Sequence, residues 1–292
     1  MKLKIAIVQS LFLFLALFLS TLSQATPALW SAEKNGVTSY LFGTVHVGDA
    51  SMNGLPHKVK SAINRSKYTV VELDMSTLSP LDIQRKLASF VASTEVKPLQ
   101  EALSPPVYNQ LKSYFAKRDI NIELFRGQPV WMVMLTIIQL EYQKAGYSEA
   151  FGIDKQVIAH AKQLNKPIKP LETFEQQLAM FSNIAQMGDE MMGQTLSQME
   201  DVKTFIHDMI SAWKTGDEAR LNSYYHLSFD ETKYAQLAEQ TLLIERNHAW
   251  IESLAPAMTK EPHFIAVGAL HLPLEHGLIT LLKAQGFTVK RL

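Results

Sequence analysis

Two tetrapeptides of the same form lie near opposite ends of the sequence and contain the residues best suited to chemistry. Gly43-Thr-Val-His46 and Gly268-Ala-Leu-His271 each follow an apolar run rich in β-branched and aromatic residues. Glycine lets another backbone or a ligand approach closely, and a histidine at the carboxyl end of a buried strand projects into the crevice where α/β sheets bind ligands. If the two strands are neighbours, we expect both imidazoles to converge on one site.

A third candidate, Glu72, lies inside the apolar segment Val70-Val-Glu-Leu-Asp74. Desolvating a carboxylate there costs several kcal/mol unless a cation, a metal or hydrogen-bond donors face it. Two histidines and one glutamate are a common ligand set for a catalytic divalent ion with an open position. Such an ion lowers the pKa of a bound water and polarises a carbonyl. We therefore predict His46, His271 and Glu72 as metal ligands, with Glu72 alternatively acting as a general base.

Each of these residues also has an ordinary structural explanation. A lone histidine near a strand end is usually a structural residue, and a four-residue pattern is short enough to recur by chance. The pairing of two copies, each after a strand-like run, favours a shared site. Other catalytic devices are absent from the sequence: the chain has no cysteine, which excludes thiol catalysis, and no serine stands in a G-x-S-x-G context, which disfavours serine catalysis.

The elements that must position these residues are read from the periodicity. Strand-like runs cover 39–46, 68–75, 166–171, 263–268 and 287–292, most of them continuously apolar, as is typical of strands buried on both faces. Helical patterns cover 81–91, 105–117, 129–144, 153–164 and 232–255. Met180 to Asp201, rich in Met, Gln and Ser, is expected to be a looser helical cap, with a lid as one interpretation. The alternation predicts a three-layer α/β fold: a central, mostly parallel or mixed sheet flanked by helices, with a helical insertion in the middle of the chain.

The N-terminus has the three parts of a secretory signal. A basic start with Lys2 and Lys4 precedes the apolar segment 11–19, and Ser23-Gln-Ala25 supplies small residues at a cleavage site. We expect cleavage after Ala25, leaving a single domain over 26–292 in the periplasm or secreted; the alternative is an uncleaved anchor over 5–22. The lack of cysteine excludes a lipoprotein signal and disulfides.

The charge balance excludes one class of partner. The chain has 28 basic and 28 acidic residues, about −2 in net charge once Lys2 and Lys4 are removed, and it contains no basic stripe of the kind that binds nucleic acid. After the leader, no apolar segment reaches the 18 residues of a membrane helix, so we expect no stable membrane span after cleavage. The expected partner is a peptide or small-molecule substrate.

The chain resembles the TraB/GumN family, which is similar to the TIKI metalloproteases and more remotely to the erythromycin-esterase/ChaN-like fold. The motifs that carry the resemblance extend over almost all of the predicted domain: 41–47 (LFGTVHV), the Val-Glu-Leu around Glu72, 152–154 (GID), 170–173 (PLET) with Gln176, 245–247 (ERN) with Trp250, and 267–272 (VGALHL). The sequence departs from the usual family ending at Leu270, where a smaller residue is common, and at Leu274, where glycine usually follows His-Leu-Pro.

The resemblance implies one cleft lined by His46, Glu72 and His271. It also implies that Arg246 is a cleft residue suited to bind a carboxylate or an oxyanion. Asp154 and Glu172 match further acidic positions of the family. Ordinary alternatives for these two are helix capping by Asp154 and an ion pair for Glu172.

Three functions remain open at this point. The first is a metal-dependent hydrolase, a peptidase by similarity to the TIKI proteases, in which manganese, cobalt or zinc would be bound. The second is a metal-free, esterase-like hydrolase in which histidine and glutamate act directly on water. The third is a binding protein for haem or another ligand, or one associated with polysaccharide export, in which the histidines ligate a cofactor or are only structural.

Overall fold

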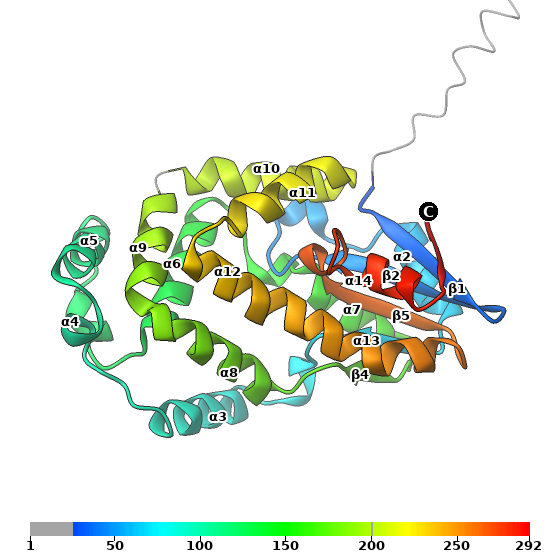
Figure 1. Ribbon diagram of the computed structural model, residues 1–292, viewed down its shortest axis with the longest axis horizontal. Helices are drawn as coiled ribbons and strands as arrows, with labels where there is room; N and C mark the ends of the chain where they lie inside the picture. Colours follow the sequence, from blue (N-terminus) through cyan, green and yellow to red (C-terminus); the bar gives the residue numbers. More distant parts are fainter. Residues whose placement is uncertain (1–25, 200) are drawn as a thin grey trace, which may run out of the picture.

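Six short strands form one mixed sheet in the spatial order β4-β3-β5-β2-β1-β6 (Figure 1). The computed structural model describes residues 26–199 and 201–292. The strands are β1 (Leu29–Lys34), β2 (Val37–Thr44), β3 (Tyr68–Val71), β4 (Ile168–Pro170), β5 (His263–Gly268) and β6 (Thr288–Arg291). Strands β4, β3, β5 and β2 are parallel, while β1 pairs antiparallel with both β2 and β6. All five expected strands are present. The structure adds a sixth strand, β1, which the periodicity of the sequence did not indicate.

Helices cover both faces of this sheet. One face packs against α2 (His57–Arg65), α7 (Ile153–Gln163), α10 (Val202–Thr215) and α11 (Glu218–Ser228). The other packs against α13 (Glu245–Met258) and α14 (Leu278–Ala284). The central strands are buried on both sides, as predicted, but the edge strands β4 and β6 are largely exposed. The three-layer α/β prediction is confirmed.

A helical part with its own apolar core lies beside the sheet, on the left of Figure 1. It contains α3 (Pro80–Ala92), α4 (Leu99–Ala102), α5 (Pro105–Ala116), α6 (Val130–Lys144), α8 (Phe174–Ile184), α9 (Gly188–Gln198) and α12 (Lys233–Glu239). The segment expected to be a loose cap, Met180 to Asp201, forms the end of α8 and all of α9, and it buries Met191 and Met192 completely. Met191 and Met192 are therefore packing residues.

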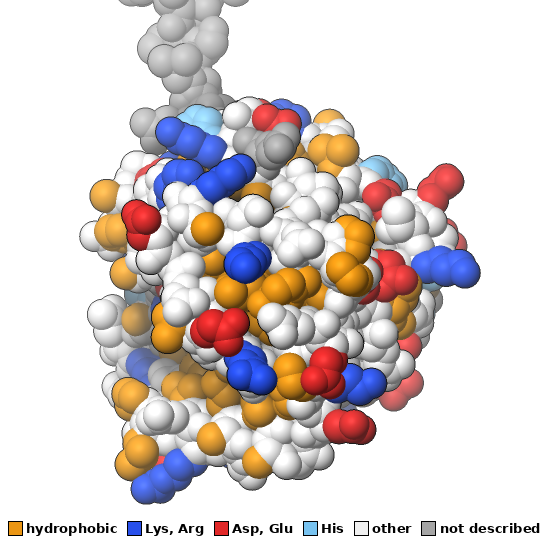
Figure 2. All heavy atoms as spheres, turned by 90° about the vertical axis from the view of Figure 1, so that its left-hand side faces the viewer, with side chains coloured by type: hydrophobic (Ala, Val, Ile, Leu, Met, Phe, Trp, Pro, Cys, Tyr) orange, Lys and Arg blue, Asp and Glu red, His pale blue; other side chains and the backbone are white. Residues whose placement is uncertain are grey.

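The outer face of the helical part combines apolar and charged side chains. Figure 2 shows apolar side chains gathered in its centre, with basic and acidic side chains interspersed around them. Leu124, which is 71% exposed, is the most exposed of the large apolar side chains in the described chain.

The predicted leader lies outside the described residues, so cleavage after Ala25 and export stay predictions. Within the described parts of the chain, every helix is too short or too polar to cross a membrane.

Candidate functional site

The carboxyl ends of the four parallel strands bring the predicted residues to one edge of the sheet. Thr44, the last residue of β2, lies in register with Gly268, the last residue of β5. Glu72 follows β3, and its carbonyl accepts a hydrogen bond from the amide of Glu172, which comes two residues after β4. Crevices at this edge are where open α/β sheets bind ligands. The two GxxH strands are neighbours in the sheet, which is the condition under which we expected their imidazoles to converge.

Close approach explains the glycines of both tetrapeptides. A Cβ on Gly43 would lie 2.9 Å from the Cα of Ala269, so any side chain there would separate β2 from the segment that leads to His271. The amide of Gly268 donates to Glu72 Oε1 at 2.6 Å, and a Cβ on Gly268 would lie 3.2 Å from that oxygen. The glycines therefore position the histidine segment and the glutamate.

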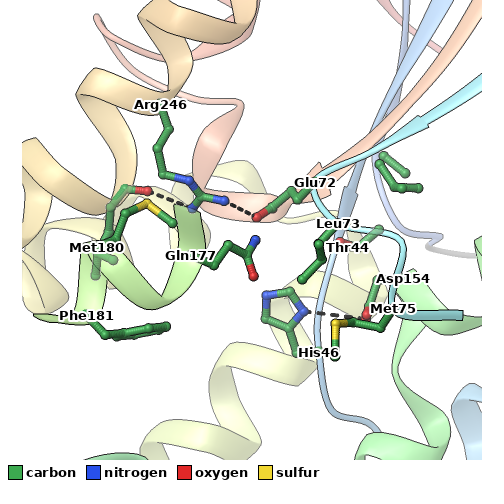
Figure 3. Close-up of a pocket in the computed structure, with 13 residues that line it drawn as sticks. Thr44, His46, Glu72, Leu73, Met75, Asp154, Gln177, Met180, Phe181 and Arg246 are labelled. Carbon is green, nitrogen blue, oxygen red and sulfur yellow. Dashed lines mark hydrogen bonds and ion pairs between the residues drawn. The ribbon is translucent and has the colours of Figure 1, made fainter. Parts of the chain in front are cut away.

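Arg246, from the first turn of α13, is the centre of the buried part of the site. It forms a two-point contact with Glu172, from Nε to Oε1 at 2.7 Å and from Nη2 to Oε2 at 2.9 Å. Nη2 also donates to Glu72 Oε2 at 2.5 Å (Figure 3). Nη1 donates to the Leu242 carbonyl at 2.9 Å and lies 3.0 Å from His271 Nε2. All five N–H groups of the guanidinium are therefore engaged inside the protein.

The carboxylate of Glu72 is ionised in this setting. Burial alone would raise the pKa of Glu72, but the charges of His271 and Arg246 outweigh it and lower the pKa to about 2. Since His271 is itself uncharged at neutral pH, Arg246 is the cation that holds Glu72 ionised there.

His271 is buried and neutral. Burial lowers the pKa of its imidazole to about 3, with the charge of Arg246 acting in the same direction against Glu72. Arginine is only a donor, so Nε2 must be the acceptor and Nδ1 carries the proton, which it donates to Asn247 Oδ1 at 2.7 Å. The amide of Asn247 is oriented by its own donation to the carbonyls of His271 and His276. Asn247 thus fixes both the ring and its tautomer.

His46 has the opposite environment. Its side chain is 69% exposed, and Nδ1 lies 3.6 Å from Asp154 Oδ1. Asp154 and, to a lesser degree, the charge of Glu72 raise the pKa of His46 to about 9. At this separation the two groups interact through their charges rather than by a direct hydrogen bond. Asp154 Oδ1 is itself buried and has no hydrogen-bond partner among residues 26–199 and 201–292.

A cavity of about 250 Å³ joins these residues (Figure 3). The lining is mixed. Its polar residues include His46, Asp154, Glu72, Arg246 and Gln177, and its apolar residues include Leu73, Met75, Met180, Phe181 and Leu242. Met75 lies beside His46 and Asp154, whereas Met180 and Phe181 lie across the cavity from them. His271 lies behind Arg246 and does not line this cavity. The two imidazoles therefore face the site from different sides.

The positions of His46, Glu72 and His271 can be compared with the prediction that they bind a metal ion. Among the described residues, no group of three or more His, Asp or Glu side chains is arranged to hold a metal ion. The Nε2 lone pair of His271 and an oxygen of Glu72 both face Arg246 rather than a common open position with His46. In this arrangement the predicted ligand set does not fit a metal ion.

The two further acidic residues differ in their partners. Glu172 forms the ion pair that its ordinary alternative describes, with Arg246, and it also accepts hydrogen bonds from Trp250 Nε1 and Gln177 Nε2. The capping alternative for Asp154 is wrong, because Gly152 occupies the N-cap position of α7. A Cβ on Gly152 would lie 2.5 Å from the His46 carbonyl oxygen, so this glycine lets the first turn of α7 approach the histidine.

Sequence reasoning missed Gln177 and the role of Asn247. The capping box of Thr173 and Gln176 fixes the start of α8 and thereby places Gln177 in its first turn, but nothing local shows that this turn faces the sheet edge. Asn247 adjoins Arg246 in the 245–247 motif, which was the available signal for a polar network there.

Comparisons with known proteins place the chain in context. The model of the TraB/PrgY/gumN family matches residues 28–291. The uncharacterized protein YbaP of Shigella flexneri is 28% identical over 245 residues, which cover 84% of this chain and 88% of YbaP. YbaP of Escherichia coli (strain K12) is 28% identical over 244 residues, 84% of this chain and 87% of that protein. Metalloprotease TIKI2 of Danio rerio is 25% identical over 304 residues, 86% of this chain and 58% of TIKI2. No solved structure matches the chain.

Proposed function

The chain belongs to the TraB/PrgY/gumN family, and from that premise we propose that it is a hydrolase in which His46 transfers the protons. The observation that supports this most directly is the exposed imidazole of His46 facing the carboxylate of Asp154 at the wall of the cavity. A histidine whose second nitrogen faces a carboxylate is the usual general base of hydrolases. The distant similarity to a metalloprotease also favours hydrolysis.

The proposed chemistry uses the two forms of His46. Neutral His46 takes a proton from water through Nε2 while Nδ1–H is directed at Asp154, and the water attacks a carbonyl carbon in the cavity. The resulting imidazolium, stabilised by Asp154, returns the proton to the leaving group. The pKa of His46, raised from 6.5 toward about 9, keeps both forms within reach at neutral to mildly alkaline pH.

The mixed lining supports a substrate with both polar and apolar groups. A carbonyl group would lie near His46, and an aliphatic or aromatic group would contact Met180 and Phe181. Peptides and esters both meet this description, and a peptide is our first choice. Because every N–H of Arg246 is engaged, we assign Arg246 an electrostatic role rather than direct contact with an oxyanion.

The test is hydrolysis of fluorogenic peptides and esters by the wild type and by His46→Ala. We expect the substitution to lower kcat/KM by about 10²- to 10⁴-fold, the usual contribution of a general base. His57→Ala, which removes an exposed histidine at the start of α2 outside the cavity, is the matched control and should retain the wild-type rate. Equal rates for His46→Ala and the wild type would refute the assignment.

A second candidate is a metal-dependent peptidase. It is favoured by the similarity to Metalloprotease TIKI2 and by the unpartnered Oδ1 of Asp154 beside His46. In this candidate His46, Glu72 and His271 would hold manganese, cobalt or zinc, which would supply an activated water, and Arg246 would have to leave His271 and Glu72. Near-stoichiometric metal in the wild-type protein, lost in both His46→Ala and His271→Ala, would establish it.

A further inference from the structure

The carboxamide of Gln177 has an orientation that its hydrogen-bond partner dictates. Nε2 donates to Glu172 Oε2 at 3.2 Å. Glu172 also accepts from Arg246 and Trp250, and a carboxylate paired in this way is only an acceptor. The nitrogen of Gln177, and not its oxygen, must therefore face Glu172. The oxygen is turned into the cavity, and Figure 3 shows it on the side of His46.

Oε1 of Gln177 is thus a free acceptor beside the proposed base. Within residues 26–199 and 201–292, the bond to Glu172 is the only hydrogen bond of the Gln177 side chain. Of the described residues that line the cavity, Gln177 is the one carboxamide. The N–H groups of Arg246, by contrast, are all engaged within the protein. An acceptor that is held in place without a donor favours a ligand that brings an N–H or O–H group.

Gln177 also lies on the same face of α8 as part of the apolar lining. Residues 177, 180 and 181 have the spacing i, i+3 and i+4, which makes them neighbours on a helix surface, and all three line the cavity. In Figure 3, Gln177 lies between His46 and the pair Met180 and Phe181. The N–H, the side chain and the carbonyl of an amino-acid residue all extend from one backbone position. One substrate residue can therefore contact Gln177, the apolar pair and His46 together.

We propose that Gln177 determines the specificity of the cavity: its Oε1 accepts a hydrogen bond from the backbone N–H of the substrate residue whose carbonyl is attacked. The cavity thereby selects peptides with an apolar residue at that position over compounds with an oxygen in place of the N–H. Such an oxygen has no proton to donate and would leave Oε1 of Gln177 unpaired. The assignment rests on the proposed hydrolysis, so its test includes binding without hydrolysis.

The experiment compares two substrates that differ only at this group. The fluorogenic coumarin esters of N-acetyl-phenylalanine and O-acetyl-phenyllactate have the same scissile ester. We expect kcat/KM of the wild type to be about 10- to 100-fold higher for the N-acetyl substrate. Gln177→Met, which keeps a long unbranched side chain but removes the amide, should reduce this preference to less than about threefold. Because the preference is a ratio taken on one sample, partial loss of folded protein does not change it.

Gln110→Met is the matched control for the substitution. Gln110 lies exposed on α5, outside the cavity. Its replacement removes the same chemical group from a helix surface, so the preference should equal that of the wild type.

Binding separates this inference from the proposed function. The probes are N-acetyl-phenylalaninamide and O-acetyl-phenyllactamide, titrated by NMR into His46→Ala, which lacks the proposed base. We expect Kd to be at least about tenfold lower for the N-acetyl probe, and nearly equal for the two probes once Gln177→Met is added. If hydrolysis is absent from the wild type but this binding preference is present, the proposed function fails and the role of Gln177 stands. Equal Kd values, binding of neither probe, or a preference that survives Gln177→Met would overturn the role, even if both esters are hydrolysed.

Discussion

His46 and His271 have opposite protonation behaviour because their surroundings differ. The facing carboxylate of Asp154 raises the pKa of His46, whereas burial lowers that of His271. At neutral pH only His46 exchanges a proton readily, because the ring of His271 is held neutral by Arg246 and Asn247. We therefore assign the proposed proton transfer in the cavity to His46, whereas His271 belongs to the buried network around Arg246.

This difference predicts the pH dependence of hydrolysis. If neutral His46 is the base, kcat/KM should rise with pH between about 6.5 and about 9, as the imidazolium loses its proton. Asp154→Asn removes the charge that stabilises the imidazolium, so the midpoint should move to lower pH. A pH–rate profile, with an NMR titration of His46, measures both midpoints.

Glu149→Gln is the control for this shift. Glu149 precedes α7, the helix that contains Asp154, but it pairs with Lys155 rather than with His46. Its loss should therefore leave the midpoint of the pH–rate profile unchanged. A profile that falls rather than rises through the window would instead make His46 a general acid.

At the level of single residues, the sequence indicated which side chains lie at the carboxyl edge of the sheet but not which contacts they make. Strand ends and glycines were enough to select His46, Glu72 and His271. The enclosure of Arg246 could not be predicted, because its two carboxylates follow different strands and only the sheet order brings β3, β4 and α13 together. The position of Gln177 at the cavity could not be predicted either, because it depends on the direction of the first turn of α8, which is set by packing in the helical part.

At the level of elements, continuous apolar runs predicted the central strands well. Strand β1 escaped because Leu29–Lys34 mixes apolar residues with Ser31 and Glu33, and its pairing with β2 and β6 is tertiary. The segment 240–244 was expected to be ordinary helix but forms a π-helix between α12 and α13. Such π segments are frequent at functional sites, and this one directly precedes the turn that carries Arg246.

Leu274, which stands where the family usually has glycine, has a strained backbone conformation. It has a φ of +67°, a left-handed conformation that glycine adopts freely and other residues adopt at about 1–2 kcal/mol. We expect Leu274→Gly to be more stable than Leu274→Ala by about 1 kcal/mol, because both lose the side chain and only alanine keeps the strain. Urea denaturation of the two variants measures the difference.

Leu81 provides the reference pair for this comparison. It lies in the first turn of α3 and is 52% exposed, so alanine should be the more stable replacement there, by helix propensity. If alanine were more stable than glycine at position 274 as well as at position 81, Leu274 would carry no backbone strain.

At the level of the whole molecule, the cavity lies between the sheet edge and the helical part. The strand ends supply His46 and Glu72, α7 and α13 supply Asp154 and Arg246, and α8 and the π segment supply the apolar wall of Met180, Phe181 and Leu242. The helical part comes from three stretches of chain, the first and second separated by α7 and β4 and the second and third by α10 and α11. The sequence patterns predicted individual helices of this part but not how they pack against one another, because helix packing depends on contacts between distant segments.

Because the buried network links β3, β4, β5 and α13, its protonation should affect the stability of the whole molecule. The folded pKa of His271, about 3, lies below its unfolded value of 6.5. The unfolded chain therefore takes up a proton as the pH falls below 6.5, and the folded chain does not. Stability should fall from pH 6.5 toward pH 3, by up to roughly 1.4 kcal/mol per pH unit from this group.

His271→Gln should be less stable at pH 7 but lose less stability between pH 6.5 and 4.5. Urea midpoints at pH 7, 5.5 and 4.5 measure both slopes, and parallel slopes would contradict the assignment. Glu72, with its pKa lowered from 4.5 to about 2, adds a loss only below pH 4.5, so its effect separates from that of His271.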